Sequence, residues 1–459
     1  MKKSNLFDEF QDTSSKGWKQ KIQSDLKGAD YNSTLIFDTP EGIPIKPFYH
    51  RDESSGPLPK ITSPSKWFIA QHIFGGNTST ANKKSADVLE RGAESLIFTI
   101  PTQATEISKL LKGLSLQNTP IHFNFQFLSS DYLKGFMDVA GSSDNNLYFN
   151  LDPIGDLARS GKWHYTRKED LNQLASLVKI QNAGSISVDT SLYQNAGANI
   201  VQQLAYGLAH ANEYLNSLES HLRDGSIPDL FTFKMAIGGN YFFEIAKLRA
   251  LRLLWNSLTD EYGIATPCHV VAQPSKRNKT LYDFNTNMLR TTMESMAAIL
   301  GGANTVCNLP YDALYHKDNE FGERIARNQL LMLKHESHLD KVSNATEGAY
   351  FIEKITLQLA EKALGLFKNI EAGGGFIKQL EDGVIQKKIK ENAQKEQQTF
   401  NDGKEVLVGT NVYQNSSDAM KSNLELYPFV KTEPRKTLIA PIIESRLSET
   451  LEQQRLNNE

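Results

Sequence analysis

Residues 231–255 read FTFKMAIGGNYFFEIAKLRALRLLW and contain the unit that decides the fold. The apolar run at 231–237 predicts a strand, and Gly238-Gly239 behind it predicts a turn. The residues that follow show helical spacing, with an apolar stripe formed by Phe242, Ile245, Ala246 and Leu253. A strand, a tight turn and an amphipathic helix make one unit of an α/β fold.

Arg249 lies in the middle of this apolar stripe. A guanidinium in such a place either extends along the helix to reach water or has a buried acidic partner. We expect Arg249 to reach water, with the buried partner as the alternative.

The same unit repeats on both sides of residues 231–255, because each of eight short apolar or alternating runs is followed by a helical pattern. The predicted strands are Phe68–Ile73, Ser95–Ile100, Ile121–Phe127, Asn146–Leu151, Ser185–Asp189, Phe231–Ile237, His269–Gln273 and Asn304–Asn308. Eight units over about 270 residues match a (β/α)8 TIM barrel in number and length. An open, doubly wound sheet is the alternative, and eight successive units favour closure.

The segments outside these units define the expected domain boundaries. Residues 1–65 carry Gly- and Pro-bearing segments and a polar linker, and we expect an extended N-terminal arm that packs on another surface. The barrel is expected at 66–338. A C-terminal helical extension is expected at 339–459, with a last helix from Pro441 to Arg455.

Composition excludes several classes of protein. Of the 459 residues 39% are hydrophobic, which excludes global disorder, and the net charge of −3 argues against a protein that binds nucleic acid. Two cysteines are too few for a disulfide framework or a four-thiolate zinc site. The N-terminus shows no signal peptide and the chain no run of 18 apolar residues, so we expect a soluble, cytoplasmic protein without membrane contact.

Local motifs do not identify a reaction. The glycine pairs match neither the phosphate-binding loop nor the dinucleotide fingerprint. His335 and His338 lack the spacing of a zinc protease and are expected at the surface. Cys307 ends the eighth strand, on the active face of a barrel, but no histidine lies close to it in sequence to activate a thiol.

Residues 233–255 resemble a distinctive stretch of the methylmalonyl-CoA mutase family. Further similar segments are Asp25-Leu26-Lys27-Gly28, Glu41-Gly42-Ile43, Ala196-Gly197-Ala198, Leu204-Ala205-Tyr206, Leu289-Arg290-Thr291-Thr292-Met293-Glu294, Leu300-Gly301-Gly302, Arg324-Ile325-Ala326-Arg327-Asn328 and Gly348-Ala349-Tyr350-Phe351-Ile352-Glu353. The resemblance covers nearly the whole chain in the family's order.

The resemblance implies a cofactor that this chain is not expected to hold by itself. Catalytic members carry a C-terminal flavodoxin-like domain that binds adenosylcobalamin through D-x-H-x-x-G, whose histidine ligates cobalt. The only histidine here with glycine three residues later is His72, before Gly75, and it has Ala70 where the motif needs Asp. The chain also ends about where that domain would begin. We therefore expect no cobalamin-binding domain and no metal ligand.

The catalytic residues that the resemblance implies look replaced. Active mutases carry Arg-Gln-Tyr-Ala-Gly-Phe on the first strand, and Ala70 and His72 stand at its Arg and Tyr. Their substrate-contacting Tyr-His pair after the fifth strand falls on Ser191 and Leu192, and Leu192 forms no hydrogen bond through its side chain. An active-site glutamine falls on Tyr282. We expect no catalytic residue in this chain.

The pattern is similar to the small subunit of a heterodimeric methylmalonyl-CoA mutase. In that family a large subunit interconverts (R)-methylmalonyl-CoA and succinyl-CoA with adenosylcobalamin, and the small subunit supports it. The family also implies that the arm at 1–65 wraps the large subunit. Two alternatives remain open: a catalytic acyl-CoA mutase barrel that uses a separate B12-binding chain, and a degenerate barrel that binds an acyl-CoA or nucleotide as a regulatory site.

Overall fold

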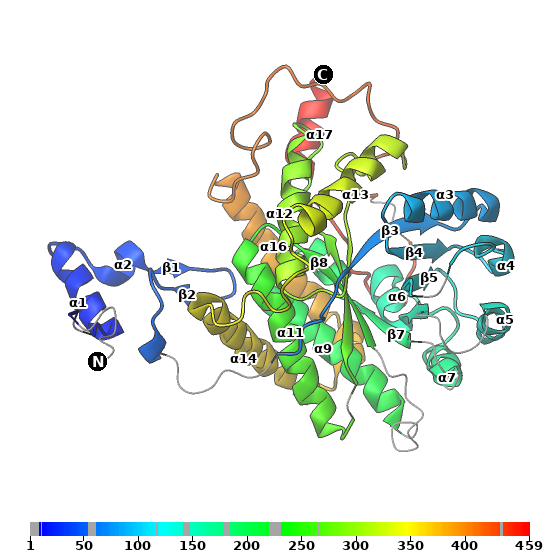
Figure 1. Cartoon of the computed structure of the whole chain (residues 1–459), viewed down its shortest axis with the longest axis horizontal. Coiled ribbons are helices and arrows are strands. Elements are labelled where there is room, and N and C mark those ends of the chain that lie inside the picture. The colour runs from blue at the N-terminus through cyan, green and yellow to red at the C-terminus, as the bar shows by residue number, and fades with distance from the viewer. Residues whose placement is uncertain are drawn as a thin grey trace, which may run out of the picture.

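Eight parallel strands close into one barrel, in the order β10-β3-β4-β5-β6-β7-β8-β9 (Figure 1). The computed structural model describes residues 9–10, 12–53, 61–115, 118–140, 147–178, 184–219, 231–264, 266–431 and 435–459. The strands are β3 (Phe68–Phe74), β4 (Ser95–Ile100), β5 (Ile121–Phe125), β6 (Leu147–Leu151), β7 (Gly184–Asp189), β8 (Phe231–Ile237), β9 (Cys268–Pro274) and β10 (Thr305–Cys307). The predicted TIM barrel is confirmed, and the open sheet is wrong because β10 pairs with β3.

Helices surround the barrel and connect its strands. They are α3 (Thr78–Glu90), α4 (Ile107–Leu110), α5 (Ser130–Ala140), α6 (Pro153–Ser160), α7 (Arg167–Val178), α8 (Ser191–Asn195), α9 (Ile200–Ser217), α11 (Tyr241–Glu261), α12 (Thr286–Leu300) and α13 (Glu320–His335). The start of α9 shows how the sequence fixes a helix end: the Asn199 side chain accepts from the Gln202 N–H, and the Gln202 side chain accepts from the Asn199 N–H.

Successive side chains of each strand point in turn to two interiors, the core between the strands and the helices and the lumen of the barrel. On β8, Phe231, Phe233 and Met235 belong to the large apolar core between the strands and the helices, where the Phe233 ring lies 5.1 Å from that of Trp255. Lys234, between two of these residues, points to the opposite side because successive side chains of a strand face opposite ways. That opposite side is the lumen of the barrel.

Arg249 does not reach water, so the expectation that it would is wrong. Its side chain is buried on α11 and donates to Glu353 Oε1 at 2.6 Å, on α14 (Tyr350–Ala372). The alternative, a buried acidic partner, is the one observed. Since α14 packs along α9 and α11, this ion pair fixes the C-terminal extension to the barrel.

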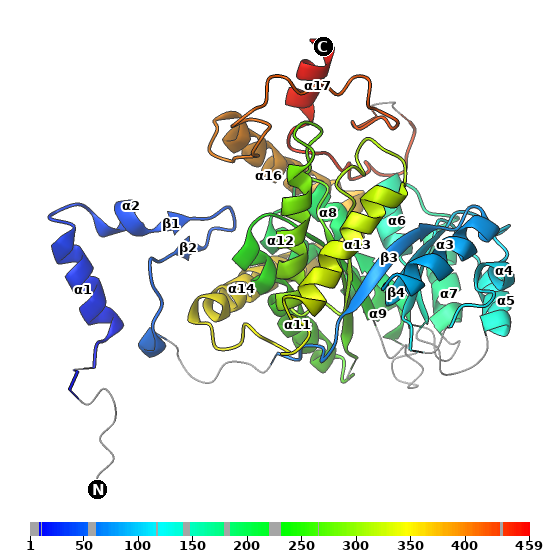
Figure 2. The same ribbon diagram turned by 45° about the horizontal axis from the view of Figure 1, so that its top comes forward.

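The N-terminal arm stands away from the body in both ribbon views (Figures 1 and 2). It contains α1 (Ser15–Asp25), α2 (Tyr31–Leu35), the short strands β1 (Phe37–Asp38) and β2 (Pro44–Ile45), and the 3-10 turn η1 (Arg51–Glu53). No residue of α1 is buried. The turn between β1 and β2 reaches the body, where Ile43 is buried in the main core and Asn199 Nδ2 donates to the Pro40 carbonyl at 3.3 Å.

The C-terminal extension continues with α15 (Phe376–Glu381), α16 (Val384–Asn401) and α17 (Glu449–Asn457). The expected helix from Pro441 is wrong in its first half, because α17 begins only at Glu449. The backbone before it bonds to barrel loops instead of to itself: Ser445 N–H donates to the Asn195 carbonyl at 3.1 Å, and Leu447 N–H to the Arg277 carbonyl at 2.9 Å. This segment therefore lies over one side of the barrel mouth.

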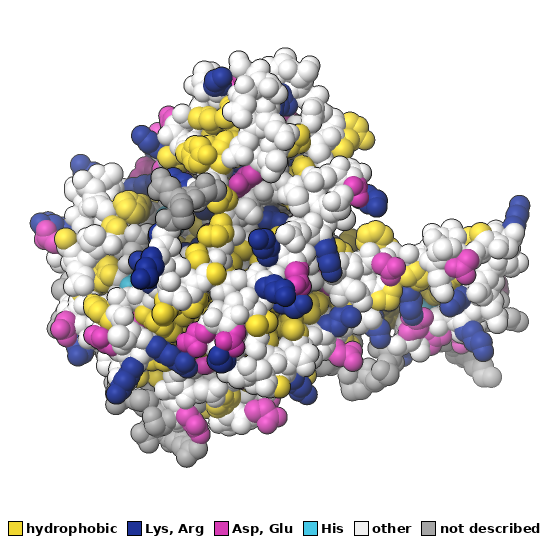
Figure 3. Space-filling view, turned by 180° about the vertical axis from the view of Figure 1, so that it is seen from behind, with side chains coloured by type: hydrophobic (Ala, Val, Ile, Leu, Met, Phe, Trp, Pro, Cys, Tyr) yellow, Lys and Arg dark blue, Asp and Glu magenta, His cyan; other side chains and the backbone are white. Residues whose placement is uncertain are grey.

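The described surface is mixed in charge. Seen from behind, cationic and anionic side chains are interspersed over the body rather than gathered by sign (Figure 3), in keeping with a net charge of −3. Among the described residues, no helix combines the length and the apolar character needed to cross a membrane.

Candidate functional site at the barrel mouth

A layer of three rings closes the lumen near the start of the strands. His122, Tyr148 and His269 have ring centroids 4.4 to 5.1 Å apart, and we call this layer the ring floor. Burial lowers the pKa of His122 well below its usual value, and burial together with the charge of Arg252 lowers that of His269 to about 3. Both imidazoles are therefore neutral near pH 7, and they fill the barrel axis as uncharged rings.

Above the ring floor the lumen has two unlike walls. One consists of Ala70, Ile97, Val271 and Cys307, which form an apolar cluster separate from the main core, and we call it the apolar wall. The other, the polar wall, consists of Asn124, Asn150, Ser187 and Lys234, each of which alternates with core residues of its strand. Within it Asn150 Nδ2 donates to Asn124 Oδ1 at 2.8 Å.

His72 lies at the mouth, two residues after Ala70 on the same face of β3. Its Nε2 is 2.8 Å from Thr99 Oγ1, and the ring is open to solvent although protein surrounds it on the inner side of the barrel. Partial desolvation in this concave setting lowers the pKa of His72 to about 4, and the charges of Lys276, Lys84 and Lys234 add to that effect. A neutral imidazole therefore occupies the position where the resemblance implies a tyrosine.

Of the other positions singled out from the sequence, Ala70 lies two residues before His72 on the same face of β3, whereas Ser191, Leu192 and Tyr282 lie elsewhere. Ala70 belongs to the apolar wall, and Ser191 starts α8 with its hydroxyl bonded to Asp189. Leu192 is buried in the main core, outside the lumen. Tyr282 packs in a separate cluster with the C-terminal segment, and its hydroxyl donates to Glu459 Oε1 at 2.5 Å. The five residues thus form no single constellation.

A buried polar network beside the mouth could not be read from motifs. Asp152 Oδ1 lies 2.9 Å from His210 Nε2 and accepts from the Tyr214 hydroxyl at 2.7 Å, while the Tyr193 hydroxyl is 2.9 Å from His210 Nδ1. Burial alone would raise the pKa of Asp152, but the charge and hydrogen bond of His210 lower it to about 2. The network is enclosed and joins the loop after β6 to α8 and α9, so it acts as a structural brace.

Burial decides the reactivity of the two cysteines, and the arrangement of the possible ligands decides whether a metal ion could bind. Cys268 and Cys307 are both free and buried, and burial raises the pKa of Cys307 to about 12, which keeps it a thiol rather than a nucleophilic thiolate. Among the described residues, no group of three or more His, Cys, Asp or Glu side chains is arranged to hold a metal ion. His72, whose Nε2 lies 2.8 Å from Thr99 Oγ1, stands on β3 of the barrel itself and not in a separate domain.

A closed parallel barrel with polar groups at the carboxyl ends of its strands defines a TIM barrel of the kind that many enzymes use. A family profile described as methylmalonyl-CoA mutase matches residues 102–454. The chain belongs to the methylmalonyl-CoA mutase family.

Three curated relatives illustrate the similarity. The chain is 32% identical to the methylmalonyl-CoA mutase small subunit of Porphyromonas gingivalis, over 92% of this chain and 73% of that protein. It is 28% identical to the small subunit of Streptomyces virginiae, over 84% and 68%. It is 27% identical to the methylmalonyl-CoA mutase of Cereibacter sphaeroides, over 86% of this chain but only 64% of that protein. Small subunits are thus among the relatives.

Proposed function

We propose that this chain is the non-catalytic small subunit of a heterodimeric methylmalonyl-CoA mutase and supports a catalytic large subunit. The observation that carries the proposal is the state of the family's catalytic positions. Leu192 stands where a hydrogen-bonding side chain is expected, and it is buried in the apolar core. Deleting a preorganised polar contact of this kind typically costs about 10²-fold or more in turnover.

His122, Tyr148 and His269 stack across the barrel axis, so the interior below the mouth is filled with side chains, as is usual in TIM barrels. Adenosylcobalamin does not fit the described residues of this chain, so we assign the cofactor to the large subunit and derive no step through it here.

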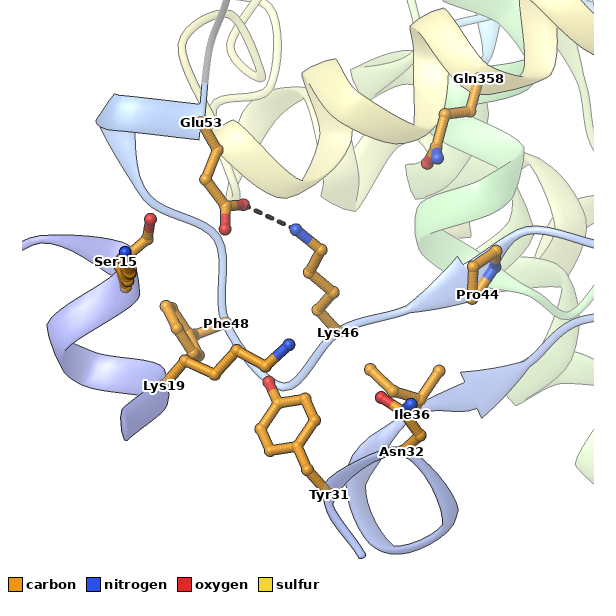
Figure 4. A pocket seen from close by; sticks show the side chains of 11 residues that line it. Ser15, Lys19, Tyr31, Asn32, Ile36, Pro44, Lys46, Phe48, Glu53 and Gln358 are labelled. Atoms are coloured by element: carbon orange, nitrogen blue, oxygen red, sulfur yellow. Dashed lines mark hydrogen bonds and ion pairs between the residues drawn. The ribbon is translucent and has the colours of Figure 1, made fainter. Parts of the chain in front are cut away.

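The arm offers the binding surface for that large subunit. A cavity of about 530 Å³ lies between the arm and α14, lined by Lys19 of α1, Tyr31 of α2, Lys46 and Phe48 behind β2, and Gln358 of α14 (Figure 4). The Lys19 ammonium lies 4.8 Å from the centroid of the Tyr31 ring, and Lys46 Nζ lies 3.1 Å from Glu53. An arm with so little burial of its own is stabilised by a partner that fills this space.

The decisive experiment purifies this chain together with a methylmalonyl-CoA mutase large subunit and measures formation of succinyl-CoA. We expect turnover to disappear when the large subunit's tyrosine–histidine pair is mutated. Turnover should stay within about twofold when His72→Ala is made in this chain, because a group that touches no substrate has no transition-state contact to lose. Substantial turnover from a complex whose large subunit is inactive would contradict the proposal and favour a catalytic barrel.

A truncation that removes the arm tests the partner separately. Without residues 1–53 the chain should lose most of its affinity for the large subunit, measured by co-elution in size-exclusion chromatography. The barrel should still fold, because the arm contributes little to the main core beyond Ile43. Unchanged co-elution would show that the partner docks elsewhere.

A further inference from the structure

Two lysines of the N-terminal arm have no acidic partner among the described residues. The cavity of about 530 Å³ between the arm and α14, which we call the arm cavity, is lined by Lys16 and Lys19 of α1 and by Lys46 behind β2. Lys46 is paired with Glu53, whose carboxylate lies 3.1 Å away. No described carboxylate lies within 4.0 Å of the ammonium of Lys16 or Lys19. The lining therefore keeps two positive charges that the described chain leaves unpaired.

Other carboxylates of the arm have partners of their own. Asp25 lies 2.7 Å from Lys21, one turn back on α1. Asp52 accepts from the Ser15 N–H at 2.8 Å, and Asp30 caps α2 by accepting from the N–H of its third residue at 2.7 Å. We therefore expect the acidic group that pairs with the two lysines to come from another molecule.

Aromatic and aliphatic side chains form the lining next to these charges. Tyr31 and Ile36, at the two ends of α2, and Phe48 border the same space as the Lys19 side chain (Figure 4). The Lys19 ammonium lies 4.8 Å from the centroid of the Tyr31 ring, so the positive charge and the ring form one joint surface. An occupant of the arm cavity thus meets a cation and apolar groups together.

The helix α1 needs a larger cover than a small ion provides. It has 11 residues, none of them buried, and a helix of this length is only marginally stable in water without tertiary contacts. Trp18 on this helix is 49% exposed, and its ring centroid lies 5.9 Å from that of Phe48 in the cavity lining. A small anion would pair with the lysines but leave Trp18 in water. A polypeptide segment covers both, which favours a protein partner.

We infer that the arm cavity receives an acidic segment of the large subunit, whose carboxylates pair with Lys16 and Lys19. An apolar side chain of that segment packs against Tyr31, Ile36 and Phe48. The inference rests on the proposed function for the identity of the partner. The unpaired charges decide the chemistry of the segment, because a basic segment would meet two lysines without a compensating carboxylate.

The first experiment measures the affinity of the full chain for a methylmalonyl-CoA mutase large subunit by biolayer interferometry. Lys19→Glu brings a negative charge to the place of the partner's carboxylate, and we expect it to weaken binding at least about tenfold. Lys21→Glu is the matched control on the same helix. Lys21 does not line the arm cavity and pairs with Asp25 at the surface, so the affinity should stay within about twofold of the parent. All three lysines of α1 are exposed, so neither variant should impair folding.

A zero-length cross-linker identifies the carboxylates directly. A carbodiimide joins a lysine amine to a carboxylate that lies against it, and mass spectrometry then locates the amide. We expect links from Lys16 or Lys19 to Asp or Glu residues of the large subunit. The pair of Lys21 and Asp25 within α1 provides the internal standard for the reagent. A complex that shows the internal link but no link from the two cavity lysines would contradict the inference.

The outcomes separate this inference from the proposed function. If the parent chain forms no complex with the large subunit, both fail. If it forms an active complex that Lys19→Glu weakens no more than Lys21→Glu does, the inference alone is overturned. A chain that dimerises by itself and loses the dimer on Lys19→Glu would also overturn it, because a second copy would then be the occupant.

Discussion

The two faces of β8 differ in the kind of side chain that they carry. Phe231, Phe233 and Met235 are buried in one continuous core with the surrounding helices. Lys234, one residue away from Phe233, lies in a lumen of mixed character beside Asn150 and Ser187. The outer face carries the stability of the fold, whereas the inner face is free to change its chemistry while the barrel persists.

This difference accounts for how a barrel could keep its family's scaffold while losing its family's catalytic groups, as we propose for this chain. The outward residues are constrained by close packing, so replacing them leaves cavities. The inward residues near the mouth lie outside that core. Ala70 and His72 stand where the resemblance implies an arginine and a tyrosine, and β3 keeps its regular pairing with β4. The stability of the fold and the chemistry of the lumen therefore respond to different substitutions.

The largest effect is expected on the outer face. Phe233→Ala removes a fully buried ring that packs against Trp255, and we expect it to lower the free energy of unfolding by about 3–5 kcal/mol. Urea denaturation followed by circular dichroism measures the change. A loss below about 1 kcal/mol would contradict the assignment of this face as the stabilising one.

The second-largest loss of stability is expected at the buried ion pair between Arg249 and Glu353, which joins α11 to α14. Glu353→Ala leaves the Arg249 guanidinium buried without its carboxylate, and we expect a loss of about 3 kcal/mol, because an unpaired buried charge keeps its desolvation cost. The double variant Arg249→Met with Glu353→Leu should recover most of that loss. If the double variant were as unstable as the single one, packing rather than charge would be the cause.

The ring floor gives an intermediate effect that depends on pH. The pKa of His269 is lowered from 6.5 to about 3, so below pH 6.5 the unfolded chain binds a proton that the folded chain does not. Stability should therefore fall with decreasing pH, by about 1.4 kcal/mol per unit from this one group, and His269→Gln should remove that part of the slope. Denaturation curves between pH 7 and pH 4 test this.

His164 provides a control of opposite sign. Its hydrogen bond to Asp156 raises its pKa, so its contribution to stability is present at low pH and is lost as the pH rises through the raised pKa. His164→Gln should thus leave the acid-side slope in place. A variant at His164 that abolished the slope would show that the surface, not the ring floor, governs it.

The architecture was predictable from sequence because strand and helix periods are local. All eight predicted strands overlap the observed ones, and each of the eight observed strands begins within one residue of its predicted start. Arg249 was predicted wrongly because its partner, Glu353, lies 104 residues away along the chain. The local spacing of residues does not indicate which carboxylate, distant in sequence, packs against the Arg249 guanidinium.

The site was less predictable because it depends on register around a closed barrel. Three rings from β5, β6 and β9 meet in the ring floor only after closure brings His269 beside Tyr148, whose ring centroids lie 4.6 Å apart. The place of Tyr282 depends on the C-terminal segment, whose Arg455 lies 3.9 Å above the tyrosine ring. The alternation on β8 did contain a signal, since a lysine between Phe233 and Met235 has to face the lumen.

The smallest change in the free energy of unfolding is expected at Lys234, the residue that follows Phe233, where the largest change is expected. Lys234→Met should change the free energy of unfolding by less than about 1 kcal/mol and in the stabilising direction, because it removes a partly desolvated charge that has no described ion-pair partner. The comparison with Phe233→Ala uses the same strand, the same denaturant and the same optical signal. If the two variants were equally destabilising, the lumen would contribute to stability as much as the outer face does. The proposed loss of catalytic groups would then need another explanation than the independence of the two faces.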